Sequence, residues 1–320
     1  MRDLAADLTV ETVLGPTAPG QLGRTQMHEH LLLDIYPSRW SFEHILDDID
    51  VAVEELERFR GAGGGGIVEV TPRGAGRDPR GLREISQRSD VHIVMGTSFL
   101  WGSPVVDDLL TTRGPDDLAE LMVRDLTEGV DDTGIRAGVI GEVGCGSTRS
   151  SGGKTRINPA EERLLRAASR AQLQTGALIY TDTFHGELAL DQLAILSEEG
   201  VDLGRVVIGH LGDRRQTPYY QRIAEAGANL GFDHAGMTNC APDNWRVDTL
   251  RQLIDSGWEQ RIVLSMDVHR RSYWHCMGGA GYDYLLNQFV PMLREGGISD
   301  NAIDTMLVDN PARLLPFQRC

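Results

Sequence analysis

The hydrophobic positions of the chain fall into short apolar runs that alternate with longer amphipathic segments. Short apolar runs are typical of strands buried on both faces, and segments with a period near 3.6 are typical of helices. The predicted strands cover residues 24–27, 67–71, 91–96, 137–143, 177–181, 205–209, 228–232 and 261–265. The predicted helices cover residues 43–60, 82–87, 116–128, 159–175, 188–199, 219–226, 247–256, 284–294 and 301–307. Strands that are each followed by a helix predict an α/β fold, a (β/α)8 TIM barrel with a parallel sheet.

The segment 43–60 shows the helical pattern. Its apolar residues Ile45, Ile49, Val53, Leu56 and Phe59 recur at helical spacing, and a glycine cluster follows directly. No Pro/Ser-rich linker divides the chain, so we expect residues 1–320 to form one domain. The segment 267–281 is long, aromatic and basic, which indicates a functional loop.

Composition narrows the possible partners. A formal net charge of -16 argues against nucleic acid or an anionic membrane as a binding partner, because binding to either requires a basic protein surface. The four cysteines form no paired motif, and the start of the chain has no secretory pattern. We therefore expect a cytoplasmic protein that acts on a small molecule.

Polar side chains that commonly bind metals stand at the ends of the predicted strands. They are His28 and His30 on the first strand, Glu142 on the fourth, Asp182 on the fifth, His210 on the sixth, Asp233 and His234 on the seventh, and Asp267 on the eighth. In a TIM barrel the chemistry takes place at the carboxyl ends of the strands, so these side chains should converge on one mouth.

Nitrogen and carboxylate donors without a thiolate favour zinc, manganese, cobalt or iron. A carboxylate that bridges would hold two ions about 3.5–4 Å apart. Such a pair polarises a carbonyl or phosphoryl oxygen and makes hydroxide available near neutral pH, while an aspartate accepts the released proton. The sequence predicts one or two divalent transition-metal ions, with zinc as the first expectation.

Six motifs, in order along nearly the whole chain, resemble the phosphotriesterase family of the amidohydrolase superfamily. They are GRTQMHEH at 23–30, RAGVIGE at 136–142, IGH at 208–210, GFDH at 231–234, LSMD at 264–267 and VDNPAR at 308–313. The resemblance implies that His28, His30 and Asp267 hold the more buried metal and that His210 holds the more exposed one. Glu142 occupies the bridging position, where many members carry a carboxylated lysine. In this it resembles the phosphotriesterase homology proteins and the lactonase-like members.

The resemblance also implies a path for protons. Asp267 would take the proton of the attacking hydroxide, and Asp213 and His234 match positions that relay it outward in phosphotriesterases. Family resemblance further suggests a homodimer.

One position departs from the family pattern. Members usually carry a histidine ligand of the exposed metal at the end of strand five, where this chain has Asp182. The aspartate can coordinate the same ions, or the exposed metal is lost and the enzyme is mononuclear. A third alternative is that His185, three residues on, reaches the mouth instead.

The substrate side offers fewer signals. Arg270 and Arg271, with Tyr273 beside them, lie on the predicted functional loop and suggest a carboxylate or phosphate on the substrate. Trp101 and Tyr180 are candidates for apolar walls of the pocket. For Cys145, which follows Glu142, we expect a packing role, because no histidine base stands at a recognisable spacing.

These residues lead to a first hypothesis of a metal-dependent hydrolase acting on a small ester, in particular a lactone with an anionic group. Hydrolysis of a phosphotriester, a phosphodiester or an amide on the same site is the alternative, because barrel family does not fix the substrate. A hypothesis of another class is a binding protein that has lost turnover, for which Asp182 is the one supporting feature.

Overall fold

The computed structural model describes residues 8–317, except residues 101, 105, 145–147 and 150–154. At its centre lies a sheet of eight parallel strands, and each strand pairs with the next one of the sheet along the chain. In order they are β3 (Arg24–Glu29), β6 (Gly64–Glu69), β7 (His92–Thr97), β8 (Val139–Gly144), β11 (Ile179–Asp182), β12 (Val206–Ile208), β13 (Asn229–Phe232) and β14 (Ile262–Leu264).

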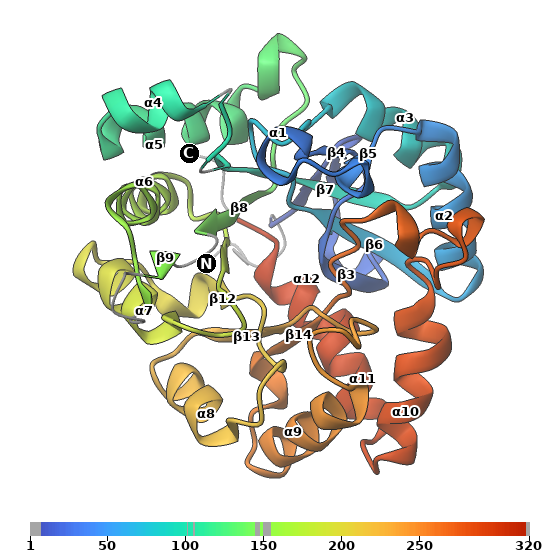
Figure 1. The fold of residues 1–320 in the computed structure, drawn as a ribbon. Coiled ribbons are helices and arrows are strands. Elements are labelled where there is room, and N and C mark those ends of the chain that lie inside the picture. The colour runs from blue at the N-terminus through green and yellow to red at the C-terminus, as the bar shows by residue number, and fades with distance from the viewer. Residues whose placement is uncertain (1–7, 101, 105, 145–147, 150–154, 318–320) are drawn as a thin grey trace, which may run out of the picture.

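The last strand returns to the first and closes the barrel. The amide of His28 donates a hydrogen bond to Ser265 Oγ (2.9 Å), and the amide of Asp267 donates to the carbonyl of His28 (3.2 Å). The predicted (β/α)8 barrel is thereby confirmed (Figure 1).

Helices cover the outside of the barrel on all sides (Figure 1). They are α2 (Ile49–Gly61), α3 (Pro79–Ser89), α4 (Asp107–Thr112), α5 (Pro115–Thr127), α6 (Pro159–Thr175), α7 (Ala189–Glu198), α8 (Thr217–Glu225) and α9 (Asp243–Asp255). After β14 follow η9 (Leu285–Phe289), α10 (Val290–Glu295), α11 (Asp300–Asp304), η10 (Thr305–Asp309) and α12 (Asn310–Leu314).

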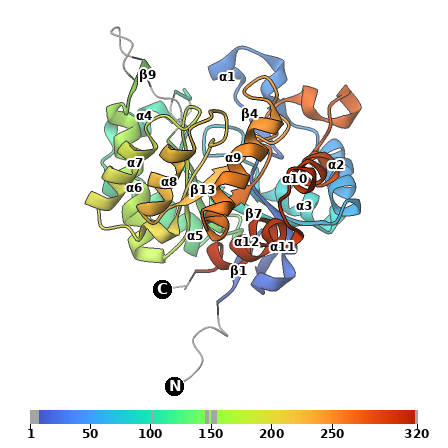
Figure 2. The same ribbon diagram turned by 90° about the horizontal axis from the view of Figure 1, so that it is seen from below.

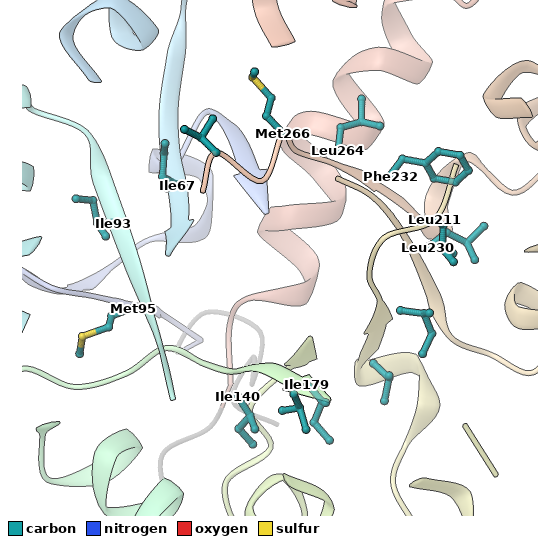
Figure 3. Packing of buried hydrophobic residues seen from close by; sticks show 14 of the residues in the cluster. Ile67, Ile93, Met95, Ile140, Ile179, Leu211, Leu230, Phe232, Leu264 and Met266 are labelled. Carbon is teal, nitrogen blue, oxygen red and sulfur yellow. The ribbon is translucent and has the colours of Figure 1, made fainter. Parts of the chain in front are cut away.

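Both faces of the strands are buried because neighbouring side chains alternate between two apolar layers. Val68, Val94, Val139, Val207 and Val263 point into the barrel and pack against one another. Their neighbours Ile67, Ile93, Ile140, Ile208 and Leu264 belong to the layer between the sheet and the helices, part of which Figure 3 shows. This double burial explains why the strands read as continuous apolar runs in the sequence.

The two ends of the barrel differ. Val10, Leu22, Leu314 and Leu315 join the inner apolar layer and fill one end. The other end carries α1 (Tyr36–Arg39) and the small sheet of β4 (Leu33–Asp34) and β5 (Ile45–Leu46). Figure 2 shows β1 (Val10–Thr12) and α12 at one end of the molecule and α1 and β4 at the other. The strands end at the α1 side, which leaves that mouth open to functional side chains.

The prediction of one helix over 43–60 was wrong at its start. Residues Phe42–His44 form a 3-10 turn, Ile45–Leu46 form β5, and the helix begins only at Ile49. The cause is local, because the carboxylate of Asp48 accepts the amide of Val51 (3.1 Å) and so caps the helix. Several short elements were also not predicted: β1, β2 (Gly15–Thr17), α4, β9 (Thr148–Arg149) and β10 (Thr155–Arg156).

Among the described residues, no helix combines the length and apolar character that crossing a membrane requires.

Candidate metal centre

His28 and His30 end β3 and turn their rings towards the acids of the mouth. Between the pairs Gln26↔Ile67 and Glu29↔Glu69, β3 holds one residue more than β6. A bulge of this kind re-aims side chains at the end of a strand. His28 Nε2 lies 3.2 Å from Glu142 Oε2, and His30 Nε2 lies 3.3 Å from Asp267 Oδ1. The structure therefore brings this predicted group together.

The ring of His28 provides the test of whether these residues fit a metal. His28 is fully buried, and neither ring nitrogen has a hydrogen-bond partner within the described chain. Buried polar atoms without partners are rare, because desolvation without a hydrogen bond costs about 1–3 kcal/mol each. Carboxylate oxygens of Glu142 and Asp267 stand 3.2 and 3.8 Å from Nε2. A divalent cation between these atoms satisfies both the nitrogen and the acids, so the residues fit the metal.

The tautomer of His30 is fixed by a chain of hydrogen bonds behind it. The hydroxyl of Thr71 donates to the carboxylate of Glu69, so its oxygen accepts from His30 Nδ1 at 2.8 Å. Nε2 is therefore the nitrogen of His30 that faces Asp267 and that a metal ion would bind. Such support from behind is typical of histidine ligands of metals.

A second group of ligand atoms lies beside the first, on strands β8, β11 and β12. Ligand atoms of Glu142, Asp182 and His210 lie within 4.8 Å of one another, and His210 Nε2 is 3.0 Å from Asp182 Oδ1. Glu142 contributes to both groups, as a bridging carboxylate must. The structure thus places Asp182 next to His210, whereas the nearest partner of His185 is a different acid.

The buried carboxylate of Asp233 holds His210 in place and lies near His28. It accepts the amide (2.8 Å) and Nδ1 (3.1 Å) of His210 and the hydroxyl of Tyr180 (2.8 Å), and it lies 3.6 Å from His28 Nδ1. The sequence already placed Asp233 at the mouth, because it stands directly before His234 at the end of a predicted strand.

Glu29, between the two histidines, fixes the position of Asp267. Its buried carboxylate accepts the hydroxyl of Ser265 (2.6 Å) and the amides of Met266 (2.7 Å) and Val268 (2.8 Å). Burial raises the pKa of Glu29 to about 7, against the lowering effect of these hydrogen bonds. Sequence reasoning did not give Glu29 a role, although its place inside the motif was a signal.

Two of the candidate ligands have an unusual backbone. His210 and Asp267 adopt left-handed conformations, with φ of 58° and 55°. A left-handed non-glycine residue costs on the order of 1–3 kcal/mol and is concentrated at functional sites. Both conformations are held by backbone amides: that of His210 donates to the carboxylate of Asp233, and that of Asp267 donates to the carbonyl of His28.

The charges of the site support the binding of cations. Burial by itself would lower the pKa of His30, but the hydrogen bond with Asp267 and the charge of Glu142 raise it to about 9. Burial is likewise outweighed at His210, where Asp182 and Asp233 raise the pKa well above its ordinary value. The histidines around Asp267 hold the pKa of this acid far below its ordinary value despite its burial. A field that attracts protons this strongly also attracts divalent ions.

The predicted proton path leads from Asp267 to His234 and Asp213. His234 Nε2 lies 3.4 Å from Asp267 Oδ2, and its Nδ1 lies 2.6 Å from Asp213 Oδ2. The buried Arg246 binds the other oxygen of Asp213 at 2.6 Å and also pairs with Asp243 (2.8 Å). Arg246 comes from helix α9 and had no recognisable signal in the sequence.

Two of the predicted pocket residues are placed elsewhere. The expectation that Tyr180 forms a pocket wall was wrong. Its side chain is fully buried one layer below Asp182 and does not reach the pocket. Glycines make room for its ring, since a Cβ at Gly231 would come within 2.4 Å of its hydroxyl. Arg271 was wrongly expected to face the substrate. Its guanidinium donates to the carbonyl of Ile45 (2.5 Å) and pairs with Asp47.

The other loop residues remain near the mouth. Arg270 Nε approaches His269 Nε2 at 3.3 Å, and His269 in turn lies 3.1 Å from Asp267 Oδ2. Tyr273 lines an apolar cavity of about 120 Å³ together with Met237 and Met266. His269 was missed, although it lies in the segment that the sequence marks as functional.

Two further residues of the sequence analysis, Trp101 and Cys145, lie outside the described residues.

The chain is similar to proteins of known family. The model of the phosphotriesterase family matches residues 8–315. The phosphotriesterase homology protein of Escherichia coli is 34% identical over 91% of this chain and 97% of its own length. Its crystal structure, with phosphate in the active site, has a TM-score of 0.87 and covers 92% of this chain and 99% of that one.

Two other relatives have named activities. An N-acetyltaurine hydrolase of Dictyostelium discoideum is 33% identical over 84% of this chain and 74% of its own length. The crystal structure of a lactonase from Listeria monocytogenes has a TM-score of 0.89 at 28% identity and covers 97% of this chain and 100% of that one.

Fold and site together define a metal-dependent hydrolase built on a TIM barrel. The chain belongs to the phosphotriesterase family.

Proposed function

We propose that this enzyme hydrolyses small carboxylic esters, in particular lactones that carry an anionic group, with two divalent ions at the mouth of the barrel. The observation that carries the proposal is the position of Asp267. Its Oδ1 faces His28 and His30, while its Oδ2 faces His234. One carboxylate thus joins the ligand group to a path for protons, which hydrolysis by an activated water requires.

His28, His30 and Asp267 would hold one ion, His210 and Asp182 the other, and Glu142 both. When bound, the ions would act as Lewis acids on the acyl oxygen and lower the pKa of water. Donors of nitrogen and oxygen type suit zinc, with manganese, cobalt or iron as alternatives.

The residues of the chain then divide the work. Asp267 accepts the proton of the attacking water, and His234 takes it from Asp267. Asp213 stabilises the imidazolium of His234, and Arg246 keeps Asp213 ionised. Burial alone would raise the pKa of Asp213. Hydrogen bonds from His185 and His234 and the charge of Arg246 nevertheless hold this pKa far below its ordinary value.

Arg270 supports the proposal that the substrate carries an anionic group. In the described part of the chain it has no carboxylate partner, and it donates one hydrogen bond, to His269 Nε2. An arginine beside the mouth of an otherwise acidic protein offers a planar pair of donors for a carboxylate. The lactonase of Listeria monocytogenes supports the ester as the reacting bond.

Amide hydrolysis is the second candidate, and it is favoured by the N-acetyltaurine hydrolase among the relatives. N-acetyltaurine also combines a carbonyl with an anionic group, so Arg270 would serve the same purpose. An amine leaving group needs a proton, and the pair of Asp267 and His234 is placed to return one. Phosphotriester or phosphodiester hydrolysis is a third use of the same site.

A substrate panel tests the proposal. We expect lactones with a carboxylate to be hydrolysed with a higher kcat/KM than their uncharged analogues, N-acetyltaurine or a phosphotriester. Arg270→Ala should raise KM for the charged lactone by about 10- to 100-fold, since a charge-assisted hydrogen bond contributes roughly 1.5–3 kcal/mol. The matched control Arg271→Ala should leave KM unchanged, because Arg271 is paired with Asp47.

Faster turnover of N-acetyltaurine than of any lactone would show that the enzyme is an amide hydrolase instead. Absence of turnover on every member of the panel, with metal bound, would leave a binding protein as the function.

A further inference from the structure

The loop after β14 carries Arg270 and Tyr273 and is closed into one unit by its own backbone. The amide of Tyr273 donates to the carbonyl of Arg270 (3.1 Å), and the amide of Gly281 donates to the carbonyl of Tyr273 (2.8 Å). We call residues 270–281 the substrate loop. Because these bonds join its two ends, an anchor at any point of the loop also fixes the place of Arg270.

One buried acid of helix α2 anchors the substrate loop. Glu55 is 2% exposed, and the other buried residues of α2 are apolar. Its Oε1 accepts the amide of His275 (2.7 Å), and its Oε2 lies 3.0 Å from His275 Nδ1. A buried carboxylate is costly unless its oxygens are paired, and both oxygens of Glu55 are paired with one residue of the loop. Figure 1 shows this orange segment beside α2.

Gly281 makes room for this contact. A Cβ at this position would come within 2.2 Å of the ring of His275 and within 2.4 Å of Glu55 Oε2. Gly281 also has a left-handed backbone (φ 62°), which glycine adopts without strain. The ring of His275 lies between two acids, since its Nε2 is 3.3 Å from Asp283 Oδ1, just beyond the loop. The end of the substrate loop is thus shaped around the contact of His275 with Glu55.

Other contacts of the substrate loop with the same part of the chain are more exposed. Arg271 pairs with Asp47, whose side chain is 62% exposed, and the amide of Ser272 lies 3.4 Å from Glu43 Oε2 at the surface. Exposed ion pairs contribute little to stability, because water and salt screen them. We therefore expect the buried contacts of Glu55 to hold the loop more firmly than those of Asp47 and Glu43.

We propose that Glu55 is a positioning residue that holds Arg270 in place for the anionic group of the substrate, an inference that rests on the proposed function. Glu55 acts through His275 and the backbone of the substrate loop, not by touching the substrate. Without Glu55, the amide and ring of His275 lose their buried acceptor, and the loop leaves its place more often. Arg270 then meets the anionic group less often, whereas Asp267 is still held by the contacts of Glu29.

A purely structural role of Glu55 has a different kinetic signature. If Glu55 served stability alone, its loss would lower the fraction of folded enzyme, and kcat/KM would fall equally for charged and uncharged substrates. A positioning role lowers kcat/KM only for the substrate whose charge Arg270 binds. The ratio of kcat/KM for a charged lactone to that for its uncharged analogue therefore separates the two roles.

The test compares Glu55→Ala with wild type on a lactone that carries a carboxylate and on its uncharged analogue. We expect the ratio of the two kcat/KM values to fall by about tenfold, because the charge-assisted hydrogen bond of Arg270 is weakened. The loss should lie in KM of the charged lactone, with kcat and metal content unchanged. Hydrogen exchange of the backbone amides over 271–281 should become faster by about tenfold or more, while exchange over Gly64–Glu69 of β6 stays the same.

Two matched variants complete the design. Glu55→Gln should restore most of the ratio, because its amide oxygen still accepts the amide of His275. Glu54→Ala, at the exposed neighbouring position of α2, should change neither measurement. If Glu55→Ala does not fold, His275→Ala, which removes the ring but keeps the amide, should lower the ratio in the same direction.

A ratio equal to that of wild type in Glu55→Ala would overturn the proposal, whether or not hydrogen exchange changes. An equal loss on both lactones would also overturn it and leave Glu55 a structural role. If wild type shows no preference for the charged lactone, the proposed function fails, and hydrogen exchange alone then decides whether Glu55 anchors the substrate loop.

Discussion

Replacing Asp267 by asparagine is expected to lower kcat/KM by about 10³-fold or more, because the amide cannot accept the proton of the attacking water. Asp267 is nearly fully buried among His28, His30, His234 and His269. No other carboxylate among the described residues touches both the ligand group and His234.

The fold should survive the substitution, since asparagine has the same shape and the Glu29 hydrogen bonds act on the backbone around position 267. Steady-state kinetics, thermal unfolding and metal analysis of the same preparation separate the effects. The exposed Asp304, which pairs with Arg24, provides the control Asp304→Asn. Activity within tenfold of wild type would show that another group accepts the proton.

Replacing Asp182 by alanine is expected to remove one of two bound ions and to lower kcat/KM by on the order of 10²–10³-fold. The magnitude follows from the several kcal/mol that a Lewis acid contributes to the transition state. The side chain of Asp182 meets His210 at 3.0 Å, so its loss leaves the second group of ligands with one member fewer.

Asp182→His is the matched variant, because histidine is the usual family residue at this position. It should retain two ions per chain and a larger share of the activity than the alanine variant. Elemental analysis after gel filtration gives both stoichiometries. If wild type and Asp182→Ala each bind one ion, the mononuclear alternative is correct.

Much of the barrel could be predicted because its strands are buried on both faces. Each strand therefore appears as an uninterrupted apolar run, and the polar residue that follows marks the mouth. The helix boundary that was predicted wrongly depends on a single side chain and on the pairing of a short strand. Apolar spacing continues from Ile45 to Phe59, but the cap at Asp48 and the pairing of β5 with β4 delay the helix.

The site could be predicted where the backbone of a strand fixes the direction of the side chain. His28 on β3 and Asp182 on β11 are of this kind. Arg271 belongs to a loop, where sequence does not determine direction, and its guanidinium turns to Asp47. Tyr180 shares a strand face with Asp182 but lies one layer deeper, in the space that glycines such as Gly231 leave.

The roles of the supporting residues could not be derived from the sequence, since they act across long separations. Glu29 holds the backbone on both sides of Asp267, and Arg246 of helix α9 holds Asp213. Neither interaction has a local sequence pattern, because each depends on how the barrel closes or how a helix packs.

The most direct test of a two-ion hydrolase is a metal titration of the chelator-treated wild type, with bound zinc and ester hydrolysis measured on the same samples. Activity should be absent without metal and should reach its maximum at two ions per chain, with His28, His30, Glu142, Asp182, His210 and Asp267 as ligands. Full activity of the metal-free protein, or a maximum already at one ion, would contradict the account.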